Sequence, residues 1–163
     1  MNGLQRAAAV LVLGCGDMRI EPPSGSTDHR WLGLRLALWP HASADEHLQE
    51  MRAVTERGDC ILLALGASGD ALGLAEAAKR HDYVNGTETS PVAFLEGLYV
   101  VPRARRTGIA RALVAAIVEW ARGERLSELA SDASLDNAGS HAMHRALGFA
   151  ETERVVFFRR GLG

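Results

Sequence analysis

The stretch Arg105-Arg106-Thr107-Gly108-Ile109-Ala110 decides the fold, because it joins an apolar strand to a helix. Residues 93–101, which precede it, are nearly all apolar, a pattern typical of a central strand covered on both faces. Gly97 within that strand predicts a bulge or a close backbone approach. After the stretch, apolar residues recur at helical spacing and predict an amphipathic helix that ends near Arg122-Gly123. The apolar positions of this helix are Ile109, Leu113, Ile117 and Trp120.

The first amide groups of a helix have no intrahelical partner and carry a partial positive charge. A small, glycine-bearing turn at that point can wrap a pyrophosphate with backbone donors, and neighbouring arginines strengthen the anion site. Gly108 and Ala110 are small enough to let phosphate oxygens reach the backbone. The same pattern also fits an ordinary turn with solvated arginines. A Rossmann site is excluded because G-x-G-x-x-G is absent.

The composition is that of one globular domain, with 163 residues of which 47% are hydrophobic and 23% charged. A formal net charge of −2 offers no field for nucleic acid, whereas a cationic small substrate is compatible with it. Cys15 and Cys60 lack the spacing of a disulfide framework or a zinc site, so we expect a reducing cytoplasm. No stretch approaches the roughly 20 apolar residues of a membrane span.

The head of the chain has two interpretations. Arg6 followed by the apolar run 7–13 resembles a short signal sequence, and Val12-Leu13-Gly14-Cys15 loosely resembles a lipoprotein cleavage site. The alternative, which we favour, is an N-terminal extension over residues 1–17 ahead of a working domain over residues 18–163. Met18-Arg19-Ile20 then starts the first strand.

The remaining elements follow from caps, turn residues and hydrophobic periodicity. We expect helices over 27–39, 43–57 and 137–147, strands over 60–65, 71–79, 126–131 and 152–160, and a polar loop over 81–91.

The order of these features resembles the GNAT acetyltransferase superfamily, whose pyrophosphate loop has the form Q/R-x-x-G-x-G/A. Leu147-Gly148-Phe149, ahead of the last predicted strand, is part of the resemblance, which covers nearly everything from Met18 onward. It implies an α/β (α+β) fold with a mixed, mostly antiparallel sheet, flanked by helices, whose bulged central strand splays from the next. It also implies that acetyl-CoA binds as co-substrate in that cleft. The implied cofactor-binding residues are Leu98, Tyr99, Val100, Arg105, Arg106, Thr107, Gly108, Ile109, Ala110 and Asn137.

Five separated stretches further resemble aminoglycoside 6′-N-acetyltransferases. They are Leu38-Trp39-Pro40, His81-Asp82-Tyr83-Val84-Asn85-Gly86, Phe94-Leu95-Glu96-Gly97, Ala130-Ser131-Asp132 and Glu151-Thr152-Glu153-Arg154-Val155. By this resemblance the antibiotic pocket is lined by Trp39, Tyr83, Glu96, Asp132 and Glu153.

The chemistry of these side chains agrees, because aminoglycosides carry several ammonium groups that carboxylates and aromatic faces bind. Glu96 stands in an apolar strand and should be paired internally, for example with an arginine, or open onto a cleft. Structural roles stay open for the others too: Asp132 as a turn or cap, Trp39 as core, Glu153 as a solvated strand residue and Tyr83 as a surface residue.

We expect direct transfer from the thioester to a neutral amine, since neither cysteine lies in the motif region. In this hypothesis the Val100 N–H holds the developing oxyanion, while Glu96 and Asp132 position the amine and receive its proton. His144 stands where many superfamily members have a tyrosine that protonates the leaving thiolate, and it can also be a packed histidine. His141 and His144 are helical neighbours without an evident third ligand, so no metal is expected.

Two other functions share these motifs: an acetyltransferase for another amine, such as a polyamine or a peptide N-terminus, and a non-catalytic acyl-CoA-binding domain. The apolar residues of the predicted strand 152–160 need cover on both faces, so we expect a homodimer that shares or swaps this strand.

Overall fold

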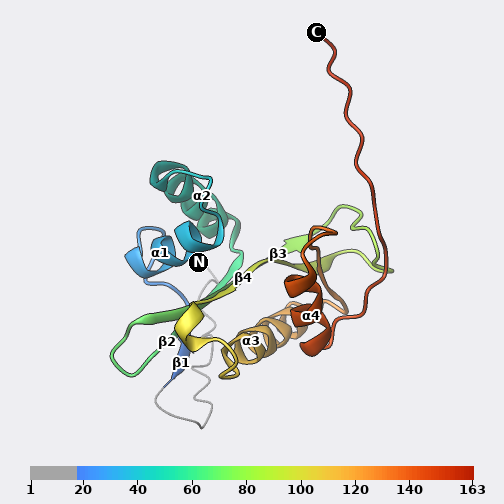
Figure 1. The fold of residues 1–163 in the computed structure, drawn as a ribbon. Helices are drawn as coiled ribbons and strands as arrows, with labels where there is room; N and C mark the ends of the chain where they lie inside the picture. The colour runs from blue at the N-terminus through green and yellow to red at the C-terminus, as the bar shows by residue number, and fades with distance from the viewer. Residues whose placement is uncertain (1–17) are drawn as a thin grey trace, which may run out of the picture.

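The computed structural model describes residues 18–163 as one mixed sheet with helices on both faces (Figure 1). The strands are β1 (Arg19–Glu21), β2 (Cys60–Leu65), β3 (Ala71–Arg80), β4 (Val92–Val100) and β5 (Leu129–Ser131). The helices are α1 (His29–Leu38), α2 (Ala44–Arg57), α3 (Ile109–Gly123) and α4 (Ala138–Ala146), with a short 3-10 turn η1 (Pro102–Ala104). The prediction that residues 1–17 form an extension lies outside the described residues.

Within the described residues, the strands run in the order β1-β2-β3-β4-β5. The first three pairings are antiparallel, and β5 lies parallel to β4, which confirms the predicted mixed, mostly antiparallel sheet. The predicted bulge is present too: Gly97 pairs with Glu76 and Leu95 with Ala77, which leaves Glu96 as the extra residue of β4.

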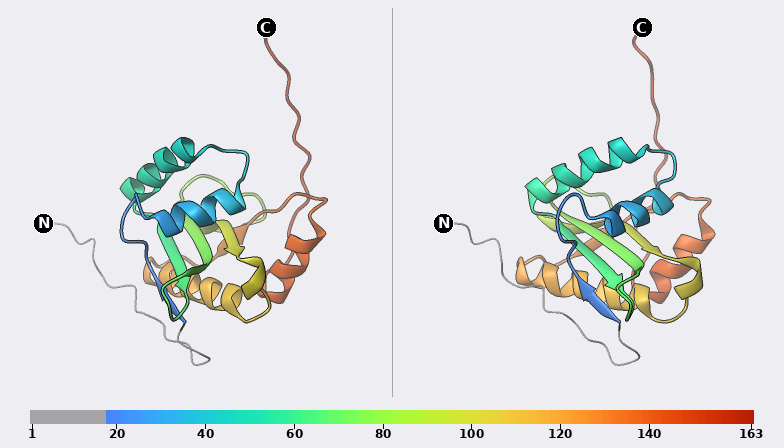
Figure 2. Two further views of the ribbon diagram at one scale, coloured as in Figure 1. Left: turned by 60° about the vertical axis from the view of Figure 1, so that its left-hand side comes forward. Right: turned by 90° about the vertical axis from the view of Figure 1, so that its left-hand side faces the viewer.

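The helices cover opposite faces of the sheet, as Figure 2 shows. On one face, Trp31 and Leu34 of α1 and Met51 of α2 pack against Leu63 and Leu74 of the sheet. On the other face, α3 buries its own apolar stripe against the central strands. That stripe consists of Ile109, Ala112, Leu113, Val114 and Ile117. Each fully buried aliphatic side chain contributes about 1.5–3 kcal/mol to the free energy of unfolding.

Local signals in the sequence explain where the first helices begin and end. Asp28 caps α1 by accepting a hydrogen bond from the Arg30 amide at 2.9 Å. Ser43 and Glu46 form a reciprocal capping box at the start of α2. Gly58 ends α2 in the left-handed region, with φ of +75°, which glycine adopts without strain.

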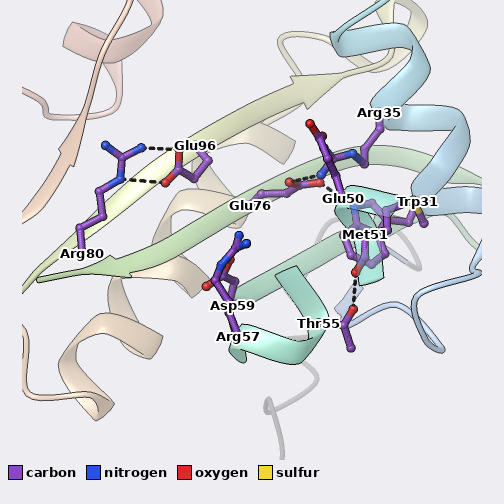
Figure 3. A network of polar contacts seen from close by, with 10 residues as sticks. All are labelled: Trp31, Arg35, Glu50, Met51, Thr55, Arg57, Asp59, Glu76, Arg80 and Glu96. Carbon is purple, nitrogen blue, oxygen red and sulfur yellow. Dashed lines mark hydrogen bonds and ion pairs between the residues drawn. The ribbon is translucent and has the colours of Figure 1, made fainter. Parts of the chain in front are cut away.

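A buried ion pair ties α1 to β3 (Figure 3). Arg35 donates to Glu76 at 2.6 Å, and Trp31 Nε1 donates to the other Glu76 oxygen at 2.6 Å. Only 4% and 5% of the Arg35 and Glu76 side chains are exposed. Burial raises the pKa of the Glu76 carboxyl above its usual value, while Arg35 and Trp31 act in the opposite direction. The pair is therefore a fixed part of the core.

The predicted last strand is wrong for the single chain. Residues 150–163 form neither strand nor helix and run away from the domain (Figure 1). Val155, Val156, Phe157 and Phe158 are between 50% and 94% exposed. The composition of this segment favours a strand, but a strand needs a neighbouring edge, and the chain does not bring one alongside. Among residues 18–163, no helix has both the length and the apolarity that crossing a bilayer requires.

Candidate active site

The centre of the candidate site is the point where β4 and β5 separate. These parallel strands are in register only from Ala93 opposite Leu129 to Leu95 opposite Ser131. Glu96 and Asp132 are the next residues on the two strands, so both predicted carboxylates follow the last registered pair. Beyond this point β4 continues to Val100 without β5 beside it. The structure therefore contains the predicted splay.

The backbone of Val100 faces the splayed side of β4. In an antiparallel pair the N–H and C=O of one residue point the same way, and successive residues alternate. The Val101 amide donates to the Leu72 carbonyl toward β3, at 2.9 Å. The N–H and C=O groups of Val100 must then point away from β3, and the Val100 carbonyl indeed accepts a hydrogen bond from Arg105 Nε at 3.0 Å. The Val100 N–H is therefore directed to the open edge.

The loop before α3 suits an anion. No side chain caps the N-terminus of α3, and Gly108, its N-cap residue, has φ of +91° with no atom within 4 Å of the position a Cβ would take. Arg106 also lies in the left-handed region, with φ of +62°. Residues 105–108 are exposed, and Thr107 closes the turn by donating to the Ala104 carbonyl at 2.7 Å. Open amides beside guanidinium groups are the donor set that a diphosphate requires.

Glu96 is held by an arginine. Arg80 donates to both Glu96 oxygens, from Nε at 3.0 Å and from Nη2 at 2.7 Å (Figure 3). The Arg80 guanidinium also lies 3.7 Å from the centre of the Phe94 ring. About a third of the Glu96 side chain is exposed, 33%. The two alternatives for Glu96 are thus combined, since the carboxylate is paired and also accessible.

Four of the five residues predicted to line the antibiotic pocket are divided between two cavities. Tyr83, which is 75% exposed, and Glu96 line a cavity of about 830 Å³ that Arg80 also borders. Asp132 and Glu153 line a second cavity of about 740 Å³. The loop between β3 and β4 borders both cavities, because its residues 81–84 line the first and its residues 85–87 line the second.

Trp39 borders neither cavity and instead packs over the bulge of β4. A Cβ on Gly97 would lie 2.7 Å from Trp39 Cη2 and 3.0 Å from Leu38 Cδ2, so only glycine leaves room for the indole. The His47 ring stacks beside the indole with a centroid distance of 6.4 Å, and the Arg35 guanidinium lies 4.7 Å from it. Trp39 is therefore held over Gly97, the residue that follows Glu96 in the chain.

His144 reaches across from α4 to the end of β5. Its Nε2 lies 2.9 Å from Ser131 Oγ, and its Nδ1 lies 2.8 Å from the Ser140 carbonyl. A carbonyl only accepts, so Nδ1 carries a proton. When the ring is neutral, Nε2 accepts a hydrogen bond from the Ser131 hydroxyl. When the ring is charged, Nε2 donates to Ser131 Oγ, and the Ser131 hydroxyl donates to the Leu95 carbonyl at 3.2 Å. The contacts accommodate both protonation states.

Two further predicted residues have defined surroundings. Asn137 caps α4 by accepting from the Ser140 amide at 3.0 Å, so its side-chain oxygen has a structural task. Burial raises the pKa of the Cys60 thiol to about 12, and Asp59 and Glu124 act in the same direction. A thiol in that state is a poor nucleophile. Residues 18–163 contain no group of three or more His, Cys, Asp or Glu side chains placed to hold a metal.

Sequence reasoning missed Arg80 and Ser131. Arg80 ends an alanine-rich strand, and nothing near it in the sequence points to a carboxylate sixteen positions away. The sequence indicates Ser131 only as part of the stretch Ala130-Ser131-Asp132. Its contact with His144 depends on how α4 packs, although a serine at the end of a strand next to a site was a weak signal.

Comparisons with known proteins agree with this geometry. Residues 26–149 match the model of the acetyltransferase (GNAT) family. The chain belongs to this family of acetyltransferases. It is 52% identical to the aminoglycoside N(6′)-acetyltransferase type 1 of Acinetobacter baumannii over 147 residues, which is 90% of this chain and 100% of that protein. This degree of similarity places it, within the family, among the aminoglycoside 6′-N-acetyltransferases.

Solved structures give the same result. The crystal structure of AAC(6′)-Ih from Acinetobacter baumannii superposes with a TM-score of 0.84 at 52% identity, over 90% of this chain and 99% of that one. AAC(6′)-Iy, in complex with the bisubstrate analogue CoA-S-monomethyl-acetylneamine, superposes with a TM-score of 0.80 at 42% identity, over 89% of this chain and 97% of that one.

Proposed function

We propose that this protein transfers the acetyl group of acetyl-CoA to the 6′-amine of aminoglycoside antibiotics and thereby confers resistance to them. The observation that carries the proposal is the splay of β4 from β5, with Glu96 and Asp132 directly beyond the last registered pair. The similarity to aminoglycoside N(6′)-acetyltransferases over nine-tenths of the chain supports the choice of substrate.

Residues 105–110 hold the diphosphate of the coenzyme, and the edge of β4 at Leu98, Tyr99 and Val100 holds its arm. Bound acetyl-CoA supplies the activated acetyl group. Arg105 connects the two regions, because it donates to the Val100 carbonyl and its guanidinium lies 5.9 Å from the centre of the Tyr99 ring. The N–H of Val100, directed to the open edge, stabilises the negative charge that develops on the thioester oxygen.

Transfer is direct, from thioester to amine. The high pKa of Cys60 argues against a thiolate that accepts the acetyl group first. Glu96 and Asp132 hold the amine and receive its proton. His144 Nε2 then protonates the leaving thiolate, and Ser131 stabilises the charged ring by accepting from it. Substituting His144→Gln should lower kcat and leave the affinity for coenzyme A unchanged by calorimetry.

Tyr83 lines the cavity of Glu96, Glu153 lines that of Asp132, and Trp39 packs over Gly97. We expect all three to contact the antibiotic, because aromatic faces and carboxylates match a polycationic sugar. Substituting Glu96→Ala removes a charge-assisted contact of about 1.5–3 kcal/mol and should lower kcat/KM roughly ten- to hundredfold. Unchanged turnover would remove Glu96 from the mechanism.

The deciding experiment is thiol release from acetyl-CoA with aminoglycosides that carry or lack a 6′-amine. We expect turnover only with the 6′-amines, such as kanamycin and tobramycin, and a product acetylated at that nitrogen. Turnover with polyamines or peptides alone would indicate the related acetyltransferase function. Coenzyme binding without any turnover would indicate a binding domain.

We further propose that residues 18–163 are the working domain, that the protein acts in the cytoplasm, and that it forms a homodimer through residues 150–163. The exposed Val156, Phe157 and Phe158 support the dimer, because apolar side chains in such a row need a covering surface. A chain shortened after residue 154 should be monomeric by light scattering. A full-length chain that is monomeric throughout would refute the dimer.

A further inference from the structure

Two Arg–Glu pairs each include one residue of β3, and the two pairs differ sharply in exposure (Figure 3). Glu76 and Arg80 are four residues apart on β3 and therefore project from the same face. In the Arg35–Glu76 pair 4% and 5% of the side chains are exposed, whereas in the Arg80–Glu96 pair the values are 42% and 33%. Breaking a buried pair is costly, but an exposed one contributes little. The Arg80–Glu96 pair can therefore open at low cost.

Arg80 contacts both carboxylate oxygens of Glu96. Its fork places one nitrogen on each carboxylate oxygen, at 3.0 and 2.7 Å, which is the contact set that an incoming ammonium needs. Each oxygen keeps a second lone pair, but a substrate amine that takes the positions of the fork must displace at least one of these hydrogen bonds. Because the pair borders the cavity that Tyr83 also lines, such an amine has access to it.

The surroundings of Arg80 allow it to move. Arg80 is the last residue of β3, directly before the loop that carries Tyr83. The guanidinium carbon of Arg80 lies over the Phe94 ring, 3.7 Å from its centre, and this contact does not need the N–H groups that donate to Glu96. Arg80 can release Glu96 and keep a favourable contact with Phe94.

We propose that Arg80 is a displaceable counter-ion: it occupies the ammonium site of Glu96 in the free enzyme and leaves it when the substrate amine binds. Arg80 lowers the affinity for the substrate by competing with it. In return, it keeps Glu96 from being an uncompensated charge in the free enzyme. The inference rests on the proposed function, in which Glu96 receives the amine.

The test is Arg80→Gln, assayed by KM for kanamycin and by calorimetric titration of kanamycin into enzyme saturated with coenzyme A. We expect both KM and Kd to fall about two- to fivefold, the range of an exposed ion pair, while kcat changes less than twofold. In an E96Q background the same substitution should have no effect on Kd, because the competition is then gone.

Two controls separate competition from general charge. Arg57 borders the same cavity and pairs with Asp59 at 2.5 Å, so Arg57→Gln removes the same charge without freeing Glu96 and should change Kd less than R80Q does. An aminoglycoside with a hydroxyl at the 6′-position does not place an ammonium at Glu96. Its Kd should also respond less to R80Q than that of kanamycin.

A Kd for kanamycin that stays the same or rises in R80Q overturns the inference, and so does an equal fall in R57Q. If R80Q does not fold, as judged by its thermal transition, Arg80→Lys serves instead. Lysine keeps the charge but cannot make the two-point contact with Glu96, so we expect a smaller fall in Kd. An unchanged Kd in R80K would overturn the inference. Failure of the proposed function is distinguishable, because the wild-type protein would then lack turnover.

Discussion

Gly97→Ala is the substitution whose effect follows most directly from the structure. A Cβ at residue 97 would lie 2.7 and 2.8 Å from two carbons of the Trp39 ring, and ordinary contact begins at 3.4 Å. The indole must therefore shift by about 0.7 Å or more. It has little freedom to do so, because the His47 ring and the Arg35 guanidinium lie beside it. Forcing a methyl group into such a site costs about 1–3 kcal/mol.

In a domain of this size each kcal/mol lowers Tm by roughly 2–4 °C, so G97A should lower Tm by several degrees. The shift of Trp39 also disturbs the bulge that holds Glu96, so we expect KM for the aminoglycoside to rise. The matched control is Gly33→Ala, in the exposed interior of α1, where no atom lies within 4 Å of the new methyl. Alanine there should raise stability by about 0.5–1 kcal/mol. If G97A melts like the wild type with an unchanged KM, the indole is not held against Gly97.

Three further substitutions test the fold and the mechanism. The pKa of the Asp28 carboxyl lies well below its usual value, because Arg30 donates to it at 2.6 Å. The resulting stability, about 1–3 kcal/mol, is present above the unfolded-state pKa and is lost as pH falls through the folded-state value. Urea unfolding should therefore show D28N to be less stable at pH 7 and to have lost most of that difference at low pH. Glu76→Gln removes the buried counter-charge of Arg35 and leaves it only the exposed Glu50, so in the same assay it should cost less than the roughly 3–5 kcal/mol of a fully unpaired buried charge. Peptide mapping after iodoacetamide treatment at pH 8 should find Cys60 unmodified in the folded protein, and C60A should retain the wild-type kcat. Rapid modification of Cys60, or loss of turnover in C60A, would support a thiol intermediate.

The helices and strands that local chemistry specifies were predictable from the sequence. Ser43 and Glu46 form the capping box that their spacing predicts, and Gly97 lies at the bulge that it predicted. The segment 150–163 was not predictable, because its apolar residues favour a strand, while pairing depends on a neighbouring edge that the fold of the single chain does not bring alongside. The partner of Glu96 was hidden for a similar reason, since Arg80 meets it only through the register of β3 and β4.

The bulge of β4 is what turns a buried strand into a candidate active site. Leu95 and Leu98 both pack toward α3, although they are three positions apart and residues on one face of a regular strand are an even number of positions apart. The extra residue therefore lies on the opposite face together with Gly97, whose missing side chain makes room for Trp39. Without the bulge, alternation would carry every residue after Glu96 to the other face. One inserted position thus exposes the Glu96 carboxylate beside an aromatic ring, and it does so where β5 has already diverged.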